Sequence, residues 1–305
     1  MKLKAFQKEN QKIWIPAGML LLLLLLFFGG ILMLRAKAGR ITYDEPYHSE
    51  LTGEARTVNV LLLGTDLRLP GTEDPGRCDC TMLCSFDLRK GRIRLISFER
   101  GISVPVNAWQ WELLTGAYRY VGAGGMVKII EACFGIPVDG YAHVDFDTFM
   151  AVVDALGGVN IRLTEAEAAA LNGETWNSTT YASVRLQEGL NHVNGNDALL
   201  YARLRSPDDD WARQQRQRNV IESLIRQMKT MSVFRLNRVL NDALPFINTS
   251  VPKATVNRVL ASSWKFLLNG SITQLQVPEK NYDDGIIRCD FTEQSARIKD
   301  FLSAP

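Results

Sequence analysis

Residues 58–98 read VNVLLLGTDLRLPGTEDPGRCDCTMLCSFDLRKGRIRLISF, and this stretch decides the fold. Three short apolar runs, at 58–64, 82–88 and 92–98, contain β-branched residues and have the length of buried strands. The second and third runs are separated by Arg89-Lys90-Gly91, which favours a hairpin turn. The sequence therefore predicts neighbouring strands, with one polar loop between the first and the second.

Helical patterns follow this strand region. In 125–135 the apolar residues recur at helical spacing, and a second apolar pattern over 146–158 closes with two glycines, which is typical of a helix C-terminus. A further strand is predicted at 159–163, and 235–305 has the pattern of helices and a final strand of the same domain. Strands interleaved with helices predict a single α/β sandwich with a central mixed sheet.

The N-terminal region predicts a membrane anchor. Residues 13–34 carry no charge and are long enough to cross the roughly 30 Å hydrocarbon layer as a helix. Lysines dominate the N-terminal side, so the positive-inside rule places residues 1–12 in the cytoplasm, 35–56 as a polar linker, and 57–305 as an extracellular domain. A cleaved signal peptide is the alternative, because Ala36-Lys37-Ala38 has the small-x-small form of a cleavage site.

Composition limits the classes of function. The chain has 305 residues, 46% hydrophobic and 22% charged, which is ordinary for globular protein. Its net charge of +2 is too small to indicate a polyanion-binding protein by itself. An arginine-rich helix from Trp211 raises the alternative of a DNA-binding regulator, but no helix-turn-helix pairing is evident around it. A domain outside the membrane also meets no chromosome, so we expect no nucleic acid among the partners.

Charged side chains follow the first predicted strand. Asp66 ends that strand, and Arg77 and Asp79 begin the next one. Aspartates at neighbouring strand ends suit a hard cation such as Mg²⁺, and arginines suit the phosphate oxygens that such a cation bridges. The alternative is an ordinary solvated loop.

The five cysteines match no zinc module. Cys78, Cys80 and Cys84 are predicted to lie on one face of a strand, opposite Arg77 and Asp79, as small core residues. A disulfide between Cys133 and Cys289 stays open at this point.

The region from 201 to 229 is rich in arginine. If YARLR is a strand, Arg203 and Arg205 point to one face. In the helix that follows, Arg213 and Gln217 share a stripe with apolar residues and therefore need buried partners, for which a phosphate is suited. Ion pairs with Asp208 to Asp210 are the alternative, and the other arginines of this helix, Arg216, Arg218 and Arg226, are expected to be solvated.

These residues together resemble the LytR-CpsA-Psr (LCP) family of cell-wall proteins. The resemblance covers Val58 to Met228, the motif core. It rests on the following segments: VNVLLLGTD, GRCDCTM, LISFERG, GIPVDGYAHVDFDTFMAVVDALGGVNI, LNHVNGNDALLYARLR and DWARQQRQ. A single N-terminal anchor with an external domain is also the layout of that family.

The resemblance implies an activity and its site. Members of the family transfer a glycopolymer from a polyprenyl-pyrophosphate carrier in the membrane to peptidoglycan, with Mg²⁺ at the pyrophosphate and the lipid in a hydrophobic pocket. By this resemblance, Asp66 and Asp79 hold the metal. The implied phosphate ligands are Arg77, Arg100, Arg203, Arg205 and Arg213, and the implied catalytic residues are Asp79, Arg100 and Gln217.

The chain departs from the family pattern at two positions. Gly101 stands where the family usually has an aspartate, and Leu113 stands where it often has a lysine. Glu99 is not expected to replace the aspartate, because neighbouring strand residues face opposite sides. A missing general base typically costs about 10²–10⁴ in rate. A catalytically weak polyprenyl-lipid-binding protein, acting as a partner in wall assembly, is therefore the alternative function.

Overall fold

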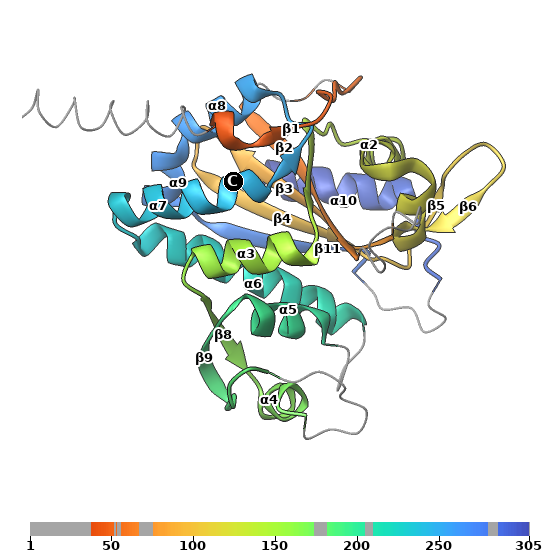
Figure 1. Cartoon of the computed structure of the whole chain (residues 1–305). Helices are drawn as coiled ribbons and strands as arrows, with labels where there is room; N and C mark the ends of the chain where they lie inside the picture. The colour runs from red at the N-terminus through yellow and green to blue at the C-terminus, as the bar shows by residue number, and fades with distance from the viewer. Residues whose placement is uncertain are drawn as a thin grey trace, which may run out of the picture.

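A seven-stranded mixed sheet forms the centre of the molecule in a computed structural model (Figure 1). The structure describes residues 38–51, 53, 56–66, 76–173, 182–204, 210–279 and 286–304. The strands, in their order across the sheet, are β1 (Thr42–Tyr43), β10 (Asn248–Thr249), β7 (Gly140–Val144), β2 (Thr57–Asp66), β3 (Arg77–Asp87), β4 (Arg92–Phe98) and β11 (Ile272–Val277). Because β2, β3 and β4 pair antiparallel while β7 and β11 join them in parallel, the predicted mixed sheet is confirmed.

Two apolar layers cover the sheet. On one face, Leu61, Leu83 and Phe98 pack with residues of α2 (Leu114–Phe134) and α10 (Phe291–Ser303). On the other face, Met82 and Leu95 pack with residues of α6 (Asp210–Thr230), α8 (Lys253–Ala261) and α9 (Ser263–Asn269). A sheet buried on both sides needs strands that are apolar nearly throughout, which is why VNVLLLG and RIRLISF read as continuous apolar runs.

A smaller unit packs against the outer side of α6. It comprises α3 (Phe146–Ala155), β8 (Val159–Leu163), α4 (Glu165–Leu171), β9 (Gly189–Val193) and α5 (Gly195–Arg203). Val153, Tyr201 and Val220 belong to its apolar cluster. The strand predicted at 159–163 is present, but it pairs with β9 in a separate two-stranded sheet. The chain continues through α7 (Val233–Ala243) and the 3-10 turn η2 (Leu244–Phe246).

The helix predicted at 125–135 is part of a longer element. It begins at Leu114 and bends at Gly122, whose φ of 61° and ψ of −172° are not helical. The helix ends before Gly135, which has a left-handed φ of 60°. The predicted end of α3 at Gly157 and Gly158 is confirmed, since both have a positive φ.

Part of the predicted linker 35–56 belongs to the fold instead. The 3-10 turn η1 (Ala38–Arg40) begins with a buried alanine. Strand β1 then pairs with β10, and the Tyr47 backbone N–H donates to the Ser250 carbonyl at 3.0 Å. The Tyr47 hydroxyl also donates to Glu131 of α2. Paired backbone groups and a buried carboxylate acceptor fix this segment to the domain.

A β-bulge changes the faces of β3. Gly64 pairs with Cys80, but Thr65 pairs with Cys78, so Asp79 is the extra residue. Cys78 therefore packs with the α2 side of the sheet, whereas Cys80 and Cys84 pack with the α6 side. The prediction that all three cysteines share one face was wrong, because the bulge resets the period of two. All five cysteines of the chain are free thiols in this structure.

The predicted membrane segment 13–34 and the tail 1–12 lie outside the described residues. No helix within the described ranges has both the length and the apolar character needed to cross a bilayer.

Candidate functional site

The bulge places Asp79 at the centre of a charged cluster. Its Oδ1 accepts a hydrogen bond from Arg100 Nη1 at 3.1 Å, and the two side chains form an ion pair in which each is about a quarter exposed (23% and 24%). The Thr115 hydroxyl donates to the same oxygen at 3.2 Å. Arg100 follows β4 and Thr115 lies in the first turn of α2. Three segments of the chain therefore meet at one carboxylate.

The charge of Arg213 reaches the same carboxylate from the opposite layer. Burial alone raises the pKa of Asp79, but the guanidinium groups of Arg213 and Arg100 and the hydrogen bonds lower it more, so the net pKa lies below its ordinary value. Arg213 lies on α6 and is only 2% exposed. Asp79 is thus held in its ionised form by the neighbouring guanidinium groups. Carboxyl groups with a shifted pKa are common at functional sites.

Asp66 lies beside this cluster at the end of β2. It is 3% exposed, and its Oδ1 accepts a hydrogen bond from the Arg77 backbone N–H at 2.9 Å. Gly76 precedes that N–H with a φ of 78°, and a Cβ atom there would lie 2.1 Å from the Asp66 carbonyl oxygen. The chain can return to the sheet this close to Asp66 only with glycine at this position.

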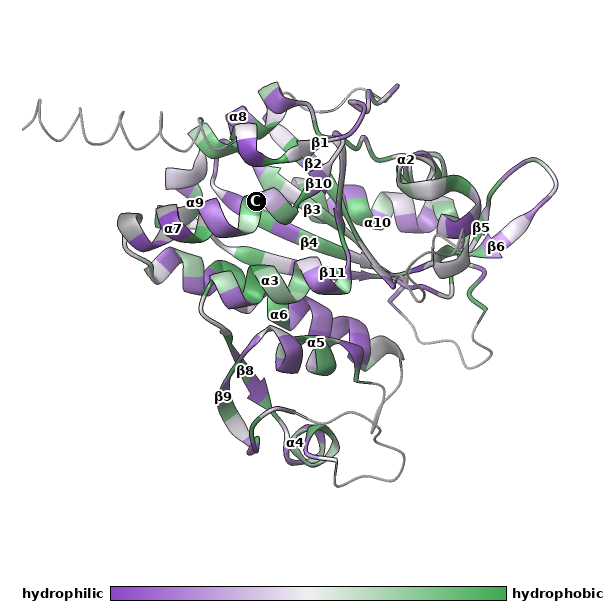
Figure 2. Ribbon diagram, viewed as in Figure 1, coloured by the Kyte–Doolittle hydropathy of each residue, from purple (hydrophilic) through white to green (hydrophobic). Residues whose placement is uncertain are grey.

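The N-terminal half of α6 is hydrophilic and yet buried. Figure 2 colours it almost entirely hydrophilic, while Arg213, Gln214, Arg216 and Arg218 are each no more than 3% exposed. Arg216 forms an ion pair with Glu167 of α4, and Arg218 donates to Gln276 of β11. The prediction that Arg216 and Arg218 are solvated was wrong, because α6 lies between the sheet and the smaller unit and has two covered sides. Arg226 is exposed as predicted.

The remaining predicted residues lie less centrally. Arg203 is exposed at the end of α5, and its guanidinium lies 4.4 Å from the centroid of the Phe146 ring. The segment that includes Tyr201 and Arg203 is helical, so the predicted strand was wrong there; Arg205 lies outside the described residues. Gln217 is half-buried on α6.

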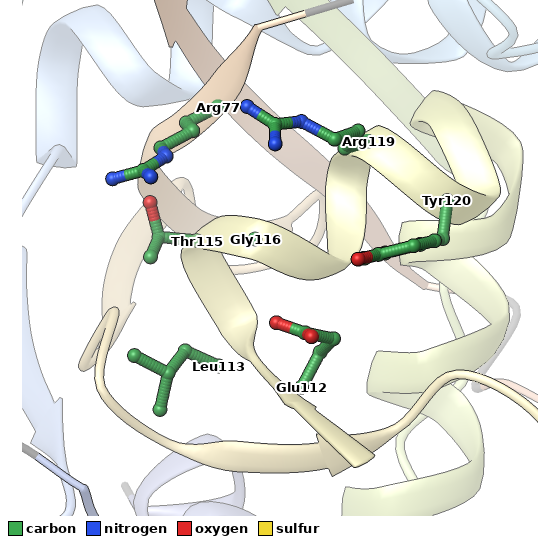
Figure 3. A pocket seen from close by; sticks show the side chains of 7 residues that line it. All are labelled: Arg77, Glu112, Leu113, Thr115, Gly116, Arg119 and Tyr120. Carbon is green, nitrogen blue, oxygen red and sulfur yellow. The ribbon is translucent and has the colours of Figure 1, made fainter. Parts of the chain in front are cut away.

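A small pocket lies beside the charged cluster (Figure 3). It is lined by Arg77, Glu112, Leu113, Thr115, Gly116, Arg119 and Tyr120. In Figure 3 the guanidinium groups of Arg77 and Arg119 lie along one side, and the carboxylate of Glu112 lies across from them. Its volume of about 140 Å³ suits one sugar ring or one phosphate better than a polyprenyl chain. Leu113, at the position of the family's lysine, contributes an apolar wall.

The buried Glu99 contacts the last strand of the sheet. It is 8% exposed, and its Oε2 accepts a long hydrogen bond of 3.5 Å from Gln276 Nε2 on β11. Its charge stabilises the buried Arg218. Glu99 is therefore engaged with Gln276 of β11 and with the charge of Arg218 on α6.

Sequence reasoning missed a histidine next to Asp66. His143, in β7, shares a hydrogen bond of 2.8 Å between its Nε2 and the Thr65 hydroxyl. The Tyr118 ring stacks on the imidazole with a centroid separation of 6.1 Å. The parallel pairing of β2 with β7 brings His143 beside Thr65, and the packing of α2 adds Tyr118. An isolated histidine in the sequence gives no signal of either.

This histidine predicts a pH dependence of stability. Burial lowers the pKa of His143 below its ordinary 6.5, although Asp145 and Asp44 raise it. The unfolded chain then binds a proton first as the pH falls below 6.5, so the free energy of unfolding falls in that window and levels off below the folded pKa. Chemical denaturation at several pH values, compared with His143→Gln, measures the effect. An identical pH slope in the variant would contradict it.

The donor set fits a magnesium ion. Mg²⁺ usually binds through one or two carboxylates, substrate phosphates and water. Asp66 and Asp79 are two such carboxylates on adjacent strand ends. Within the described part of the chain, no three His, Cys, Asp or Glu side chains gather as a complete metal site. Substrate oxygens would therefore have to complete the coordination.

The chain is thus an α/β protein with a mixed central sheet that gathers arginines and aspartates at one end of that sheet. The model of the LytR_cpsA_psr family matches residues 33–300, so the chain belongs to that family.

Curated relatives and solved structures agree with this assignment. The chain is 31% identical over 176 residues to the polyisoprenyl-teichoic acid–peptidoglycan teichoic acid transferase TagT of Bacillus subtilis, covering 57% of this chain and 53% of TagT. It is 25% identical to the regulatory protein MsrR of Staphylococcus aureus over 257 residues, covering 80% of this chain and 74% of MsrR. The match therefore spans about half the length of TagT.

The fold matches that of solved structures. A crystal structure of B. subtilis TagT superimposes with a TM-score of 0.64 at 22% identity, covering 87% of this chain and 100% of the other. The family protein YwtF (TagT) with bound octaprenyl pyrophosphate lipid gives a TM-score of 0.63 at 20% identity, covering 87% and 100%. At this identity the likeness concerns the fold.

Proposed function

We propose that this protein is a phosphotransferase that moves a glycopolymer from a polyprenyl-pyrophosphate carrier to cell-wall peptidoglycan. Membership in the LytR_cpsA_psr family and the similarity to TagT, named as a teichoic acid transferase, support this activity. The bound octaprenyl pyrophosphate in the YwtF structure supports the class of the donor lipid. In this proposal residues 57–305 lie outside the cell and segment 13–34 anchors them in the membrane.

One observation carries the proposal: Arg100, in the segment after β4, and Arg213, on α6, both act on the ionised Asp79. Arg100 contacts it directly, and the charge of the buried Arg213 lowers its pKa from the α6 side. Such a site is suited to a substrate with two phosphates and an associated divalent cation, because phosphoryl transfer depends mainly on positioning and on neutralising charge.

The residues have separable roles in this reaction. A sugar hydroxyl of the acceptor attacks the phosphorus that carries the glycopolymer, and the new P–O bond joins polymer and acceptor. Polyprenyl phosphate leaves with the electrons of the broken P–O bond and takes up the proton that the hydroxyl loses. Arg77, Arg100 and Arg213 bind the phosphate oxygens. Asp66 and Asp79 would hold Mg²⁺, which would supply Lewis-acid stabilisation of the developing charge. The Thr115 hydroxyl fixes the orientation of Asp79. Arg203, Arg205 and Gln217 complete the proposed set.

Gly101 favours the second candidate function, a catalytically weak lipid-binding protein. Gly101 is buried, and its carbonyl accepts a hydrogen bond from the Ile287 N–H at 2.8 Å. The position that usually carries an aspartate therefore supplies only backbone. A protein that only binds the lipid as a partner in wall assembly needs the phosphate-binding residues but no general base.

Turnover separates the two candidates. With the detergent-solubilised full chain, a polyprenyl-pyrophosphate saccharide and glycan strands, we expect release of polyprenyl phosphate that requires Mg²⁺ and stops with EDTA. The partner function predicts that the same lipid binds, as mass spectrometry of extracted protein would detect, without release. Absence of both binding and release would contradict both functions.

A further inference from the structure

A rigid hairpin with exposed tryptophans stands beside the charged site. Strands β5 (Ser103–Pro105) and β6 (Trp111–Leu113) form it, and it projects beyond the rest of the molecule in Figure 1. Its tip is fixed by a hydrogen bond of 2.9 Å from the Val106 N–H to the Gln110 carbonyl. The backbone N–H of Trp109 donates to Asn107 Oδ1, also at 2.9 Å. The hairpin therefore presents its side chains from an ordered backbone.

The aromatic rings on and near this hairpin face solvent. Trp109 is 95% exposed, Trp111 58% and Tyr120, at the rim of the small pocket, 55%. Large aromatic side chains grouped on a protruding, hydrogen-bonded element are typical of binding surfaces, since they supply contact area with little loss of conformational entropy.

The polar groups around these rings indicate the chemistry of the occupant. The hairpin from Ser103 to Leu113 has no lysine or arginine and one acid, Glu112, while Arg77 and Arg119 lie in the adjoining pocket beside Tyr120. The exposed Asn107 and the partly exposed Gln110 add amide donors and acceptors at the tip. Sugar rings have apolar C–H faces that stack on indole and hydroxyl groups that pair with amides. A surface for anionic lipid headgroups would instead carry lysines and arginines.

The place of the hairpin also disfavours a membrane. The segment that follows the predicted anchor enters the fold at η1, which packs against α8. In Figure 1 the hairpin lies at the end of the molecule opposite α8. Ala38, where the segment from the predicted anchor enters the fold, and the hairpin therefore lie at opposite ends of the molecule.

The hairpin is continuous with the small pocket and the charged cluster. Glu112 and Leu113 belong to both β6 and the pocket wall, and Arg77 lines the pocket and begins the strand that carries Asp79. We propose that Trp109, Trp111 and Tyr120 form a saccharide-binding platform that leads sugar rings toward this cluster. This inference rests on the proposed function and assigns a glycan site that its phosphate chemistry does not require.

Binding of lipid-free saccharides tests the platform. The detergent-solubilised full chain is titrated calorimetrically with two probes: peptide-free peptidoglycan glycan strands, and a wall glycopolymer released from its lipid. We expect at least one to bind, and the Trp109→Ala/Trp111→Ala variant to bind it at least about tenfold more weakly, the usual effect of removing central aromatic anchors. The probe that responds identifies the acceptor or the donor as the source of the sugar.

Trp264→Ala is the matched control, because Trp264 is 39% exposed but lies on α9 beside Lys265; its saccharide affinity should equal that of the wild type. Equal affinity in the double variant, or no binding of either probe by the wild type, would overturn the platform. So would quenching of tryptophan fluorescence by brominated lipids in reconstituted vesicles that disappears in the double variant, since the hairpin would then contact membrane. Binding of the polyprenyl-pyrophosphate donor, measured in parallel, reports on the proposed function separately.

Discussion

Asp79→Asn is expected to lower kcat for glycopolymer transfer by about 10²–10³, as does loss of one preorganised electrostatic group in other active sites. The amide keeps the shape of the side chain but removes the charge that Arg100 and Arg213 surround. Arg100 and Arg213 then lose the negative charge that lies between them. One proposed ligand of the metal ion is also lost. Initial rates of polyprenyl phosphate release at saturating Mg²⁺ measure the effect.

The control for this substitution is Asp147→Asn, at an exposed position in the first turn of α3. It changes the net charge equally and should leave kcat unchanged. If Asp79→Asn kept the full rate, or if both variants slowed alike, Asp79 would have no special role in transfer. An unchanged circular dichroism spectrum excludes unfolding as the cause.

Arg216→Met is expected to reduce the free energy of unfolding by about 3–5 kcal/mol, because it leaves a buried carboxylate without its partner. Arg216 Nε lies 2.7 Å from Glu167 Oε1, with the two side chains only 3% and 11% exposed. Arg216 Nη1 also donates to the Leu204 carbonyl at 2.8 Å. Urea denaturation of the full chain in detergent, followed by circular dichroism, measures the loss.

Arg226 provides the matched comparison on the same helix. It pairs with Glu222 one turn away, but its side chain is 70% exposed. Arg226→Met should therefore cost no more than about 0.5 kcal/mol, the usual value for exposed helix pairs. Adding Glu167→Gln to Arg216→Met should recover part of the lost stability, because the amide removes the unpaired charge but can still accept the Thr164 N–H in the capping box of α4. Similar losses for both single variants would contradict the burial argument.

Local patterns of the sequence identified the strands of the sheet and several residues of the candidate charged cluster. The apolar runs of β2, β3 and β4 are long and nearly continuous, so strand length and the turn at 89–91 were readable without tertiary information. Asp66, Asp79 and Arg77 were recognisable because charged residues interrupt that pattern at strand ends. The meeting of Asp79 with Arg100, by contrast, follows from pairing between distant segments and was inferred only through family resemblance.

The errors arose where packing overrode local spacing. The bulge at Asp79 moved Cys78 to the other face, and no single-strand pattern reveals an extra residue. Charged residues usually lie in solvent, so sequence alone places Arg216 and Arg218 there. The spacing of Arg203 and Arg205 is compatible with a strand over 201–205, whereas α5 continues through Arg203.

The sequence by itself determined the family, the strand order along the chain and the residue types of the site, since these depend on local periodicity and on which side chains can bind phosphate. Tertiary structure decided which charged side chains are buried by neighbouring elements and which face solvent. A second unit packs on α6, so its polar half is enclosed on two sides and its arginines must find buried partners. It also decided the surroundings of His143 and the projection of the Trp109 hairpin, because both depend on how segments far apart in the chain are brought together.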